Sequence, residues 1–386
     1  MRKIRMGMVG GGEGAFIGGV HRMAAAIDGQ IELVCGAFSS DAERSRRSGE
    51  ALYLDPKRIY PDFKTMILKE KKLPADKRMD IVSIVTPNHV HFAPAKMALE
   101  NGFHVICDKP VSFSLKEAEE LEKIVEKTGM LFALTHNYTG YPMVKQAKQM
   151  VKEGQFGKIR KVVVEYPQGW LSWKREATDS KQAGWRTDPK RSGIGGSLGD
   201  IGTHAENLAE YITGLQIKSV YADVSTFVEG RLLDDDANIL IHYDNGAKGI
   251  LHCSQICAGE ENGLNIRIWG EKGGLEWKQE EPNSLIVKWL DKPKQIHRVG
   301  YSGLYPETPA YEVASLHTRV PAGHPEGYLE AFASIYRNFA AHIQAQLAGQ
   351  PQNPLLDYPS VSDGVRGMKF IYKVVESSNK KKWVDF

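Results

Sequence analysis

A glycine-rich turn directly after an apolar run, near the start of the chain, constrains the fold most. The run Ile4–Val9 leads into the segment GGGEGAFIGGVH, which ends at His21. A continuous apolar run is typical of a strand buried on both faces of a parallel sheet. Glycines between such a strand and a helix permit a tight turn and let backbone N–H groups approach a pyrophosphate. The stretch therefore predicts a dinucleotide-binding strand–turn–helix unit.

The spacing of these glycines allows two interpretations. Gly10 and Gly12 fill the first two positions of the usual G-x-G-x-x-G fingerprint, and Ala15 fills the third as an allowed variant. Alternatively, Gly18 ends a turn that residues 13–15 lengthen. A third interpretation is a flexible turn without a ligand. In either nucleotide-binding case, contacts with the cofactor are expected from Gly10, Gly12, Phe16 and Ile17.

Two domains are predicted from the order of apolar runs. Through residue 136, apolar runs alternate with amphipathic segments, which predicts an α/β domain, a Rossmann doubly wound parallel sheet, over residues 1–136. From Ile217 to Trp289, strand-like runs follow one another with turn signals such as Tyr-Asp-Asn-Gly at 243–246. This predicts an α+β domain over residues 137–386 with a large open, mostly antiparallel sheet. Asp291–Pro325 is predicted to be irregular.

Composition excludes several classes of protein. The 50 basic and 47 acidic residues give a net charge of +3, which argues against a nucleic-acid partner. No apolar stretch approaches the ~20 residues that cross a bilayer, and no signal peptide is recognised, so no membrane partner is expected. The four cysteines are scattered and lack zinc-site spacing. We therefore expect a cytoplasmic protein with reduced thiols and no metal site.

The end of the second predicted strand bears on cofactor choice. An NAD site usually places an acid here for the ribose 2′-hydroxyl. This chain has Ser39, Ser40 and Arg44, which suit a 2′-phosphate, although Asp41 could still serve NAD. The sequence predicts NAD(P) and favours NADP(H).

Two further strands end in polar segments, VTPNHVHFAP (85–94) and HVICDKPVSFS (104–114). Parallel sheets bind ligands at the carboxyl ends of their strands. Lys109 follows a buried strand, so its amine is expected to point into the cleft. The other cofactor contacts expected from these segments are Thr86, Pro87, Asn88, His91 and Asp108.

A histidine and a carboxylate are predicted on one helix of the second domain. In GGSLGDIGTHAENLAEYITG (195–214), Asp200 and His204 are four residues apart and therefore neighbours on the helix surface. Such a pair can move a proton near neutral pH. Taken alone, a pair of this kind is more often structural.

Together, these motifs resemble the Gfo/Idh/MocA family of sugar and polyol oxidoreductases, over nearly the whole chain. The resemblance includes WRTDPKRSGIGGSLGDIGTH (185–204) and GHPEGYLEAF (323–332). Two departures are the lengthened glycine turn and Asp108-Lys109-Pro110, where the family usually has Glu-Lys-Pro. The resemblance implies that the nicotinamide lies against the open sheet and that His204 takes the hydroxyl proton. It also implies that Asp200 orients His204 and that Lys109 stabilises the alkoxide.

The function that this resemblance implies is an NAD(P)-dependent dehydrogenase or reductase for a sugar, glycoside or cyclitol. Two alternatives stay open: a glycosidase that uses bound NAD for transient oxidation and elimination, and a non-catalytic nucleotide-binding sensor. The partner is then a small-molecule sugar or polyol, and a homodimer or homotetramer is expected through the open sheet. The expected substrate-binding residues are Tyr138, Tyr166, Trp170, Trp185, Arg186, Thr203 and His324.

Overall fold

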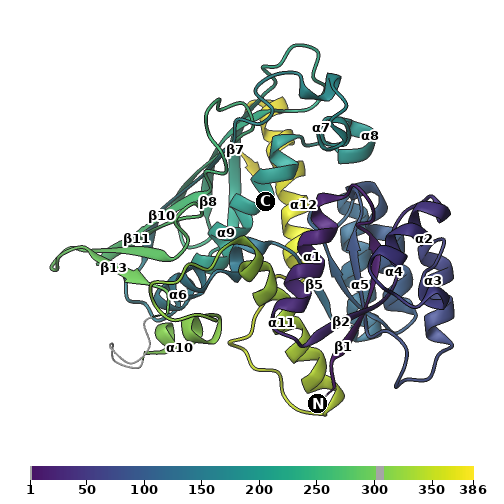
Figure 1. Ribbon diagram of the computed structural model, residues 1–386. Helices are drawn as coiled ribbons and strands as arrows, with labels where there is room; N and C mark the ends of the chain where they lie inside the picture. The colour runs from purple at the N-terminus through teal and green to yellow at the C-terminus, as the bar shows by residue number, and fades with distance from the viewer. Residues whose placement is uncertain (1, 301–307) are drawn as a thin grey trace. The chain divides into compact units, whose positions relative to one another are not determined.

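The computed structural model describes residues 2–300 and 308–386, which form two compact units (Figure 1). The first unit comprises Met1–Asn137 and Phe332–Val365. The second comprises Tyr138–Ala331 and Arg366–Phe386. Each unit contains one sheet, and each is described separately below.

The first unit contains the parallel sheet that the sequence predicts. Within the described residues it has five strands in the order β2-β1-β3-β4-β5. Because β1 pairs in parallel with both β2 and β3, the chain reverses its winding direction between β1 and β3. Ligands of doubly wound sheets bind at such a switch point. The strands are β1 Ile4–Gly10, β2 Ile31–Ala37, β3 Ile81–Val85, β4 His104–Cys107 and β5 Phe132–Leu134.

Helices of the first unit begin and end at recognisable capping residues. Ser114 and Glu117 form a capping box at the start of α5, and Gly129 ends it with a φ of 66°. From Phe332 onward, α11 packs in this unit, where its Phe332 ring lies 5.1 Å from the His21 ring. The helices are α1 Phe16–Ile27, α2 Ala42–Ala51, α3 Phe63–Lys71, α4 Phe92–Glu100, α5 Leu115–Thr128 and α11 Tyr328–Leu347, with short 3-10 turns at η1 Pro56–Arg58 and η2 Asn88–Val90.

The second unit contains the open sheet. It has nine strands in the described part of the chain, in the order β13-β12-β11-β10-β6-β9-β8-β7-β14. Every neighbouring pair is antiparallel except β6 and β9, which are parallel. These two strands therefore end at the same edge of the sheet. The strands are β6 Ile159–Pro167, β7 Ile217–Ser225, β8 Asp236–Tyr243, β9 Lys248–Ser254, β10 Asn265–Gly270, β11 Gly273–Lys278, β12 Ser284–Trp289, β13 Gln295–Arg298 and β14 Val384–Asp385.

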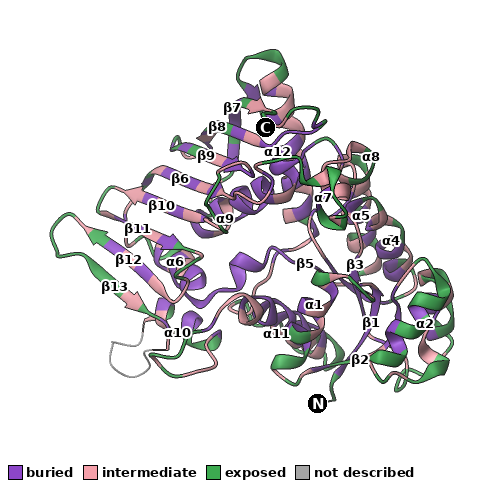
Figure 2. Ribbon diagram, turned by 45° about the horizontal axis from the view of Figure 1, so that its top comes forward, coloured by how far each residue is buried: buried purple, intermediate pink, exposed green. Residues whose placement is uncertain are grey.

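One face of this sheet is covered and the other is more exposed. Buried residues alternate with partly exposed ones along β6 and β10 (Figure 2), as in a sheet with one solvated face. Helices α6 and α9 contribute buried apolar side chains such as Val144 and Leu208. The helices of this unit are α6 Pro142–Lys152, α7 Lys181–Arg186, α8 Pro189–Ser192, α9 Thr203–Thr213, α10 Pro309–Leu316 and the part of α12 Val361–Lys380 from Arg366 onward, with short turns at η3 Asn137–Gly140, η4 Arg175–Ala177 and η5 Leu198–Gly202.

The sequence prediction was wrong for part of one segment. Asp291–Pro325 was predicted to be irregular, but it contains β13 and α10. Strand β13 is short and mostly exposed, so it lacks the apolar run by which a buried strand is recognised. Residues 301–307 of this segment lie outside the described residues. None of the described helices is long and apolar enough to cross a membrane.

Candidate functional site

The glycine turn after β1 supports the second interpretation of its spacing. Gly10, Gly11 and Gly14 have φ values of +83°, +72° and +76°, which residues with a side chain rarely adopt. Gly18 lies inside α1, and a Cβ there would stand 2.3 Å from the Cα of Gly11. Gly18 is therefore the glycine that lets the helix approach the turn. Ala15 only precedes the helix, so the turn is lengthened.

This turn fits the pyrophosphate of a dinucleotide. Ala15 gives α1 no side-chain cap, so the N–H groups of the first helical turn stay available for an anion. A Cβ on Gly10 would stand 2.8 Å from Cγ2 of Thr86, so only glycine leaves room between β1 and β3. The buried Thr86 hydroxyl has no hydrogen-bond partner among the described residues. A ligand at the switch point would supply one.

The residues after β2 are arranged around the start of α2. The Asp41 carboxylate accepts a hydrogen bond from the N–H of Arg44 at 2.7 Å and caps the helix. The Ser39 hydroxyl accepts one from the N–H of Asp41 at 3.1 Å. Ser40 and Arg44 are exposed. Hydroxyl, cationic and anionic groups therefore share the tip of β2.

The segment after β4 is fixed by hydrogen bonds within the first unit. Oδ1 of Asp108 accepts from the N–H of Lys109 at 2.9 Å and from the Thr135 hydroxyl at 3.0 Å. Burial, reinforced by the positive charge of Lys109, lowers the pKa of His136 to about 3. His136 is therefore neutral beside a lysine cation, and Asp108 holds the backbone from which that lysine projects.

His91 has a supporting position in the structure. Its Nδ1 lies 2.7 Å from the carbonyl of Pro110, and its Nε2 lies 2.7 Å from the carbonyl of Thr86. The imidazole thus joins the two segments that follow β3 and β4. Asn88 is buried beside it in η2, which Pro87 precedes. Both ring nitrogens face protein carbonyls, and the contact of His91 with the cofactor stays a prediction.

In the second unit, Asp200 and His204 lie where a π-helical turn continues into α9. Asp200 belongs to the turn Leu198–Gly202, and His204 lies in the first turn of α9. π-Helical turns are rare and often occur at functional sites. The His204 residue is 6% exposed and the Asp200 side chain is 15% exposed. Both groups are therefore largely shielded from solvent.

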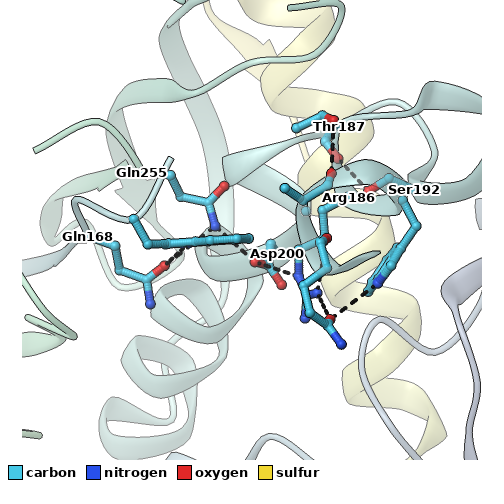
Figure 3. Close-up of polar contacts among 12 residues, drawn as sticks. Gln168, Arg186, Thr187, Ser192, Asp200 and Gln255 are labelled. Atoms are coloured by element: carbon cyan, nitrogen blue, oxygen red, sulfur yellow. Dashed lines mark hydrogen bonds and ion pairs between the residues drawn. The ribbon is translucent and has the colours of Figure 1, made fainter. Parts of the chain in front are cut away.

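The Asp200 carboxylate has two partners that the sequence did not indicate. Its Oδ2 lies 3.2 Å from Nε of Arg186 and accepts from Nε2 of Gln255 at 2.9 Å (Figure 3). The Arg186 guanidinium also lies 4.3 Å from the Trp185 ring and 5.9 Å from the Trp170 ring. Arg186, predicted to bind a sugar hydroxyl, is thus paired with the predicted catalytic carboxylate.

Two buried tyrosines flank His204. The Tyr138 ring lies 4.8 Å from the His204 ring and the Tyr166 ring lies 6.3 Å from it. The two hydroxyls hydrogen-bond to each other; Tyr166 also donates to Oδ1 of Asn262 at 2.7 Å, and Nδ2 of Asn262 donates to Tyr138 at 3.3 Å. Burial raises the pKa of both hydroxyls, which keeps them protonated. They form a closed hydrogen-bonded group beside the histidine.

Two glutamines connect this group to Asp200, and sequence reasoning missed both. Gln168 follows β6, and Gln255 follows β9, the strand parallel to it. Nε2 of Gln168 donates to Asn262 at 2.8 Å, and Nε2 of Gln255 lies 3.4 Å from Oε1 of Gln168. Oε1 of Gln168 also accepts from the Trp170 indole at 3.1 Å. The only signal in the sequence is that each glutamine follows an apolar run.

The remaining predicted substrate residues lie outside this hydrogen-bonded cluster. The Thr203 hydroxyl is buried and donates to the carbonyl of Gly199 at 3.2 Å. His324 is exposed between α10 and α11, and its hydrogen bond in the described structure is to the Pro321 carbonyl at 3.2 Å. Neither side chain is hydrogen-bonded to Asp200 or the tyrosines in the described residues.

Buried charged residues of the loop between β7 and β8 hold two parts of the tryptophan-rich loop, residues 168–197, which links β6 to η5. The Asp234 carboxylate accepts from the N–H groups of Gly196 and Leu198, at 2.5 and 2.7 Å, just before Asp200. Burial raises the pKa of Asp234 despite these bonds. The Arg231 guanidinium bonds Glu176 at 2.9 and 3.0 Å. These contacts fix the loop that carries Arg186.

A glycine turn suited to a pyrophosphate, with a shielded histidine and carboxylate in a second unit, is typical of a class of dinucleotide-binding oxidoreductases. The model of the oxidoreductase family with an NAD-binding Rossmann fold matches residues 4–138, and the GFO/IDH/MocA C-terminal domain matches residues 144–276. The chain belongs to the Gfo/Idh/MocA family, as its motifs predicted.

Three relatives illustrate the range of this similarity. The chain is 36% identical to an uncharacterised oxidoreductase of Bacillus subtilis, YfiI, over 100% of this chain and 97% of that one. It is 25% identical to levoglucosan dehydrogenase of Pseudarthrobacter phenanthrenivorans, over 100% and 98% of the two chains. An inositol dehydrogenase homologue of Azotobacter vinelandii, solved with NADH and myo-inositol, is 36% identical over 100% and 98%, with a TM-score of 0.90.

Proposed function

We propose that this protein is an NAD(P)-dependent dehydrogenase that acts on a secondary hydroxyl or ketone of a sugar, glycoside or cyclitol. The observation that carries the proposal is the setting of His204, shielded in the first turn of α9 between two protonated tyrosines. A histidine so held can take a proton from a hydroxyl near neutral pH. The myo-inositol complex of the Azotobacter homologue supports the substrate class.

In this proposal each charged group has a defined role. His204 removes the hydroxyl proton, and Asp200 orients His204 and stabilises its imidazolium form. Lys109 stabilises the developing alkoxide electrostatically, and Asp108 fixes the backbone of Lys109. When bound, the nicotinamide ring supplies the hydride acceptor at C4. Residues 1–136 bind the dinucleotide and residues 137–386 bind the polyol.

Cofactor choice is proposed from the tip of β2. Gly10 and Gly12, with Phe16 and Ile17 at the start of α1, hold the pyrophosphate of NAD(P). Ser39, Ser40 and Arg44 favour NADP(H), whereas the negative charge of Asp41 favours NAD(H), which the Azotobacter homologue binds as NADH. The ratio of kcat/KM with NADP⁺ to kcat/KM with NAD⁺ tests this preference: a ratio above one supports NADP(H), and a ratio below one contradicts it.

We also propose that the protein forms homodimers or homotetramers through the exposed face of the open sheet. Tyr221, Leu240 and Ile250 occupy paired positions on β7, β8 and β9. Their exposures are 37%, 47% and 38%, so they form an exposed apolar row. Such a row across neighbouring strands is a common site of association.

All four cysteines are free thiols, in keeping with a cytoplasmic location.

The test is formation of absorbance at 340 nm from NAD⁺ or NADP⁺ with inositols, free hexoses and glucosides. The wild type should reduce the cofactor with at least one polyol, and Lys109→Ala should lose about a hundredfold or more in rate. Lys116→Ala, an exposed lysine on α5, is the matched control. Cleavage of a glycoside without net cofactor reduction would favour the NAD-dependent glycosidase. Tight nucleotide binding with neither reaction would favour a sensor.

A further inference from the structure

We propose that Gln255 is a positioning residue for Asp200 and connects it, through a chain of side-chain amides, to the tyrosines beside His204. This inference rests on the proposed function, because it concerns how the proton-transfer pair is held. It concerns residues of the second unit only.

Both the backbone and the side chain of Gln255 are held in place by hydrogen bonds. It is 2% exposed. Its N–H donates to the carbonyl of Asp235 at 2.9 Å, and its carbonyl accepts from the N–H of Leu171 at 3.1 Å. It follows β9 at the edge where β6 also ends. Because backbone and side chain are both fixed, its amide can hold Asp200 without being ordered by substrate.

Each hydrogen bond along the chain of amides has a defined donor and acceptor. Gln255 donates to Asp200 and to Gln168, Gln168 donates to Asn262, and Asn262 donates to Tyr138. An amide carries its donor and acceptor on opposite sides, so each acceptor meets a donor only in this orientation. Reversing Gln255 would place its Oε1 against the Asp200 carboxylate, which is unfavourable. The network therefore specifies the position of Oδ2 of Asp200.

Gln255 differs from Arg186, which also contacts Asp200. Arg186 lies on α7 within the tryptophan-rich loop, and its side chain is 25% exposed. Gln255 is buried at the sheet edge, and its amide donates at every pH because it does not titrate. Gln255 therefore holds the carboxylate from the edge of the sheet, whereas Arg186 holds it from the loop.

The experiment compares pH profiles of kcat and kcat/KM for the wild type, Gln255→Glu and Gln255→Met. The substrate is the polyol that the wild type oxidises. Gln216→Glu, an exposed glutamine of the same unit, is the matched control for charge. Gln255→Glu places a second carboxylate beside Asp200, and two such groups cannot both ionise readily. The acidic limb of its profile should therefore move to higher pH by about one unit, with the control unchanged.

Gln255→Met removes the donor at similar length and adds no charge. It should lower kcat about ten- to hundredfold while KM changes less than about threefold, because a hydrogen bond to a charged group is lost. The melting temperature of each variant is measured to establish that it is folded. An unshifted profile in folded Gln255→Glu, or an unchanged kcat in Gln255→Met, would overturn the inference and leave the proposed function standing. A wild type that oxidises no polyol would overturn both.

Discussion

Arg186 and Asp200 form an ion pair in which Nε of the guanidinium lies 3.2 Å from Oδ2 of the carboxylate. The sequence assigned these residues to different tasks, one to the sugar and the other to the histidine. Their pairing places the tryptophan-rich loop in direct contact with the proposed proton-transfer pair. We expect changes in this loop to alter the rate of the reaction more than the stability of the fold.

Removing the Arg186 guanidinium should separate these two effects. Arg186→Ala should lower kcat/KM about tenfold, because Asp200 loses a charged hydrogen-bond donor. The free energy of unfolding should change by less than about 1 kcal/mol, since the pair is partly exposed. Steady-state kinetics and urea unfolding measure the two quantities. Arg191→Ala, an exposed arginine on the same loop, is the control, and an equal loss of rate in both variants would contradict the role of the pair.

The neighbouring glycines of α1 offer a matched pair of substitutions. In Gly18→Ala the new Cβ would meet the backbone of Gly11 at 2.3 Å, and backbone cannot rotate away. This variant should lose about 1–3 kcal/mol of stability and bind cofactor at least tenfold more weakly. In Gly19→Ala nothing lies within 4 Å of the new Cβ, so a gain of up to about 1 kcal/mol is expected. Calorimetry and NAD(P)H fluorescence titration measure both effects, and similar results for the two variants would contradict the account.

Buried neutral histidines should make stability fall in mild acid. Burial lowers the pKa of His21 and His104 to about 4, and burial with the charge of Lys109 lowers that of His136 to about 3. In the unfolded chain these groups titrate near ~6.5. The contribution of these neutral histidines to the free energy of unfolding is therefore complete above pH ~6.5. It is lost as the pH falls toward ~4, because only the unfolded state takes up the protons in this range.

This pH dependence can be assigned to one residue by substitution. Nδ1 of His104 accepts a hydrogen bond from the N–H of Leu131 at 2.9 Å. The substitution His104→Asn keeps a hydrogen-bond acceptor near this N–H. The slope of unfolding free energy against pH between 6 and 4.5 should decrease by about 1.4 kcal/mol per pH unit, the value for one proton. Urea unfolding at several pH values measures the slope. The same slope in the variant and the wild type would show that His104 does not contribute.

The exposed apolar row on β7, β8 and β9 predicts how the chain associates. In Leu240→Lys the new charge would lie at the centre of the row, between Tyr221 and Ile250, and should weaken a symmetric interface. The variant should sediment as a smaller species than the wild type. Leu290→Lys changes a residue that is 83% exposed outside the row and serves as the control. A wild-type monomer, or a variant assembly of unchanged size, would contradict the proposal.

Local sequence signals predicted the parallel sheet of the first unit for identifiable reasons. Its strands are continuous apolar runs, and Gly10, Gly11 and Gly14 stand where φ must be positive. The role of Gly18 could only be weighed against that of Ala15, because a close approach of helix and turn depends on three-dimensional packing. The fold class and the order of motifs were thus available from the residues alone.

The partners of Asp200 could not be predicted, because they depend on pairing between strands distant in the sequence. Gln168 and Gln255 meet because β6 and β9 are parallel neighbours, although two other strands separate them in the chain. The pairing of Arg186 with Asp200 depends on the path of a long loop that carries no periodic signal.

Transfer of a deuterium label tests the central claim most directly. Wild-type protein would be incubated with NAD⁺ or NADP⁺ and myo-inositol deuterated at its ring carbons, and the nucleotide product examined by proton NMR. The account predicts one deuterium at C4 of the reduced nicotinamide, a primary isotope effect on the rate, and loss of label transfer in His204→Asn. Reduced nucleotide without deuterium, or label transfer in His204→Asn at the wild-type rate, would contradict it.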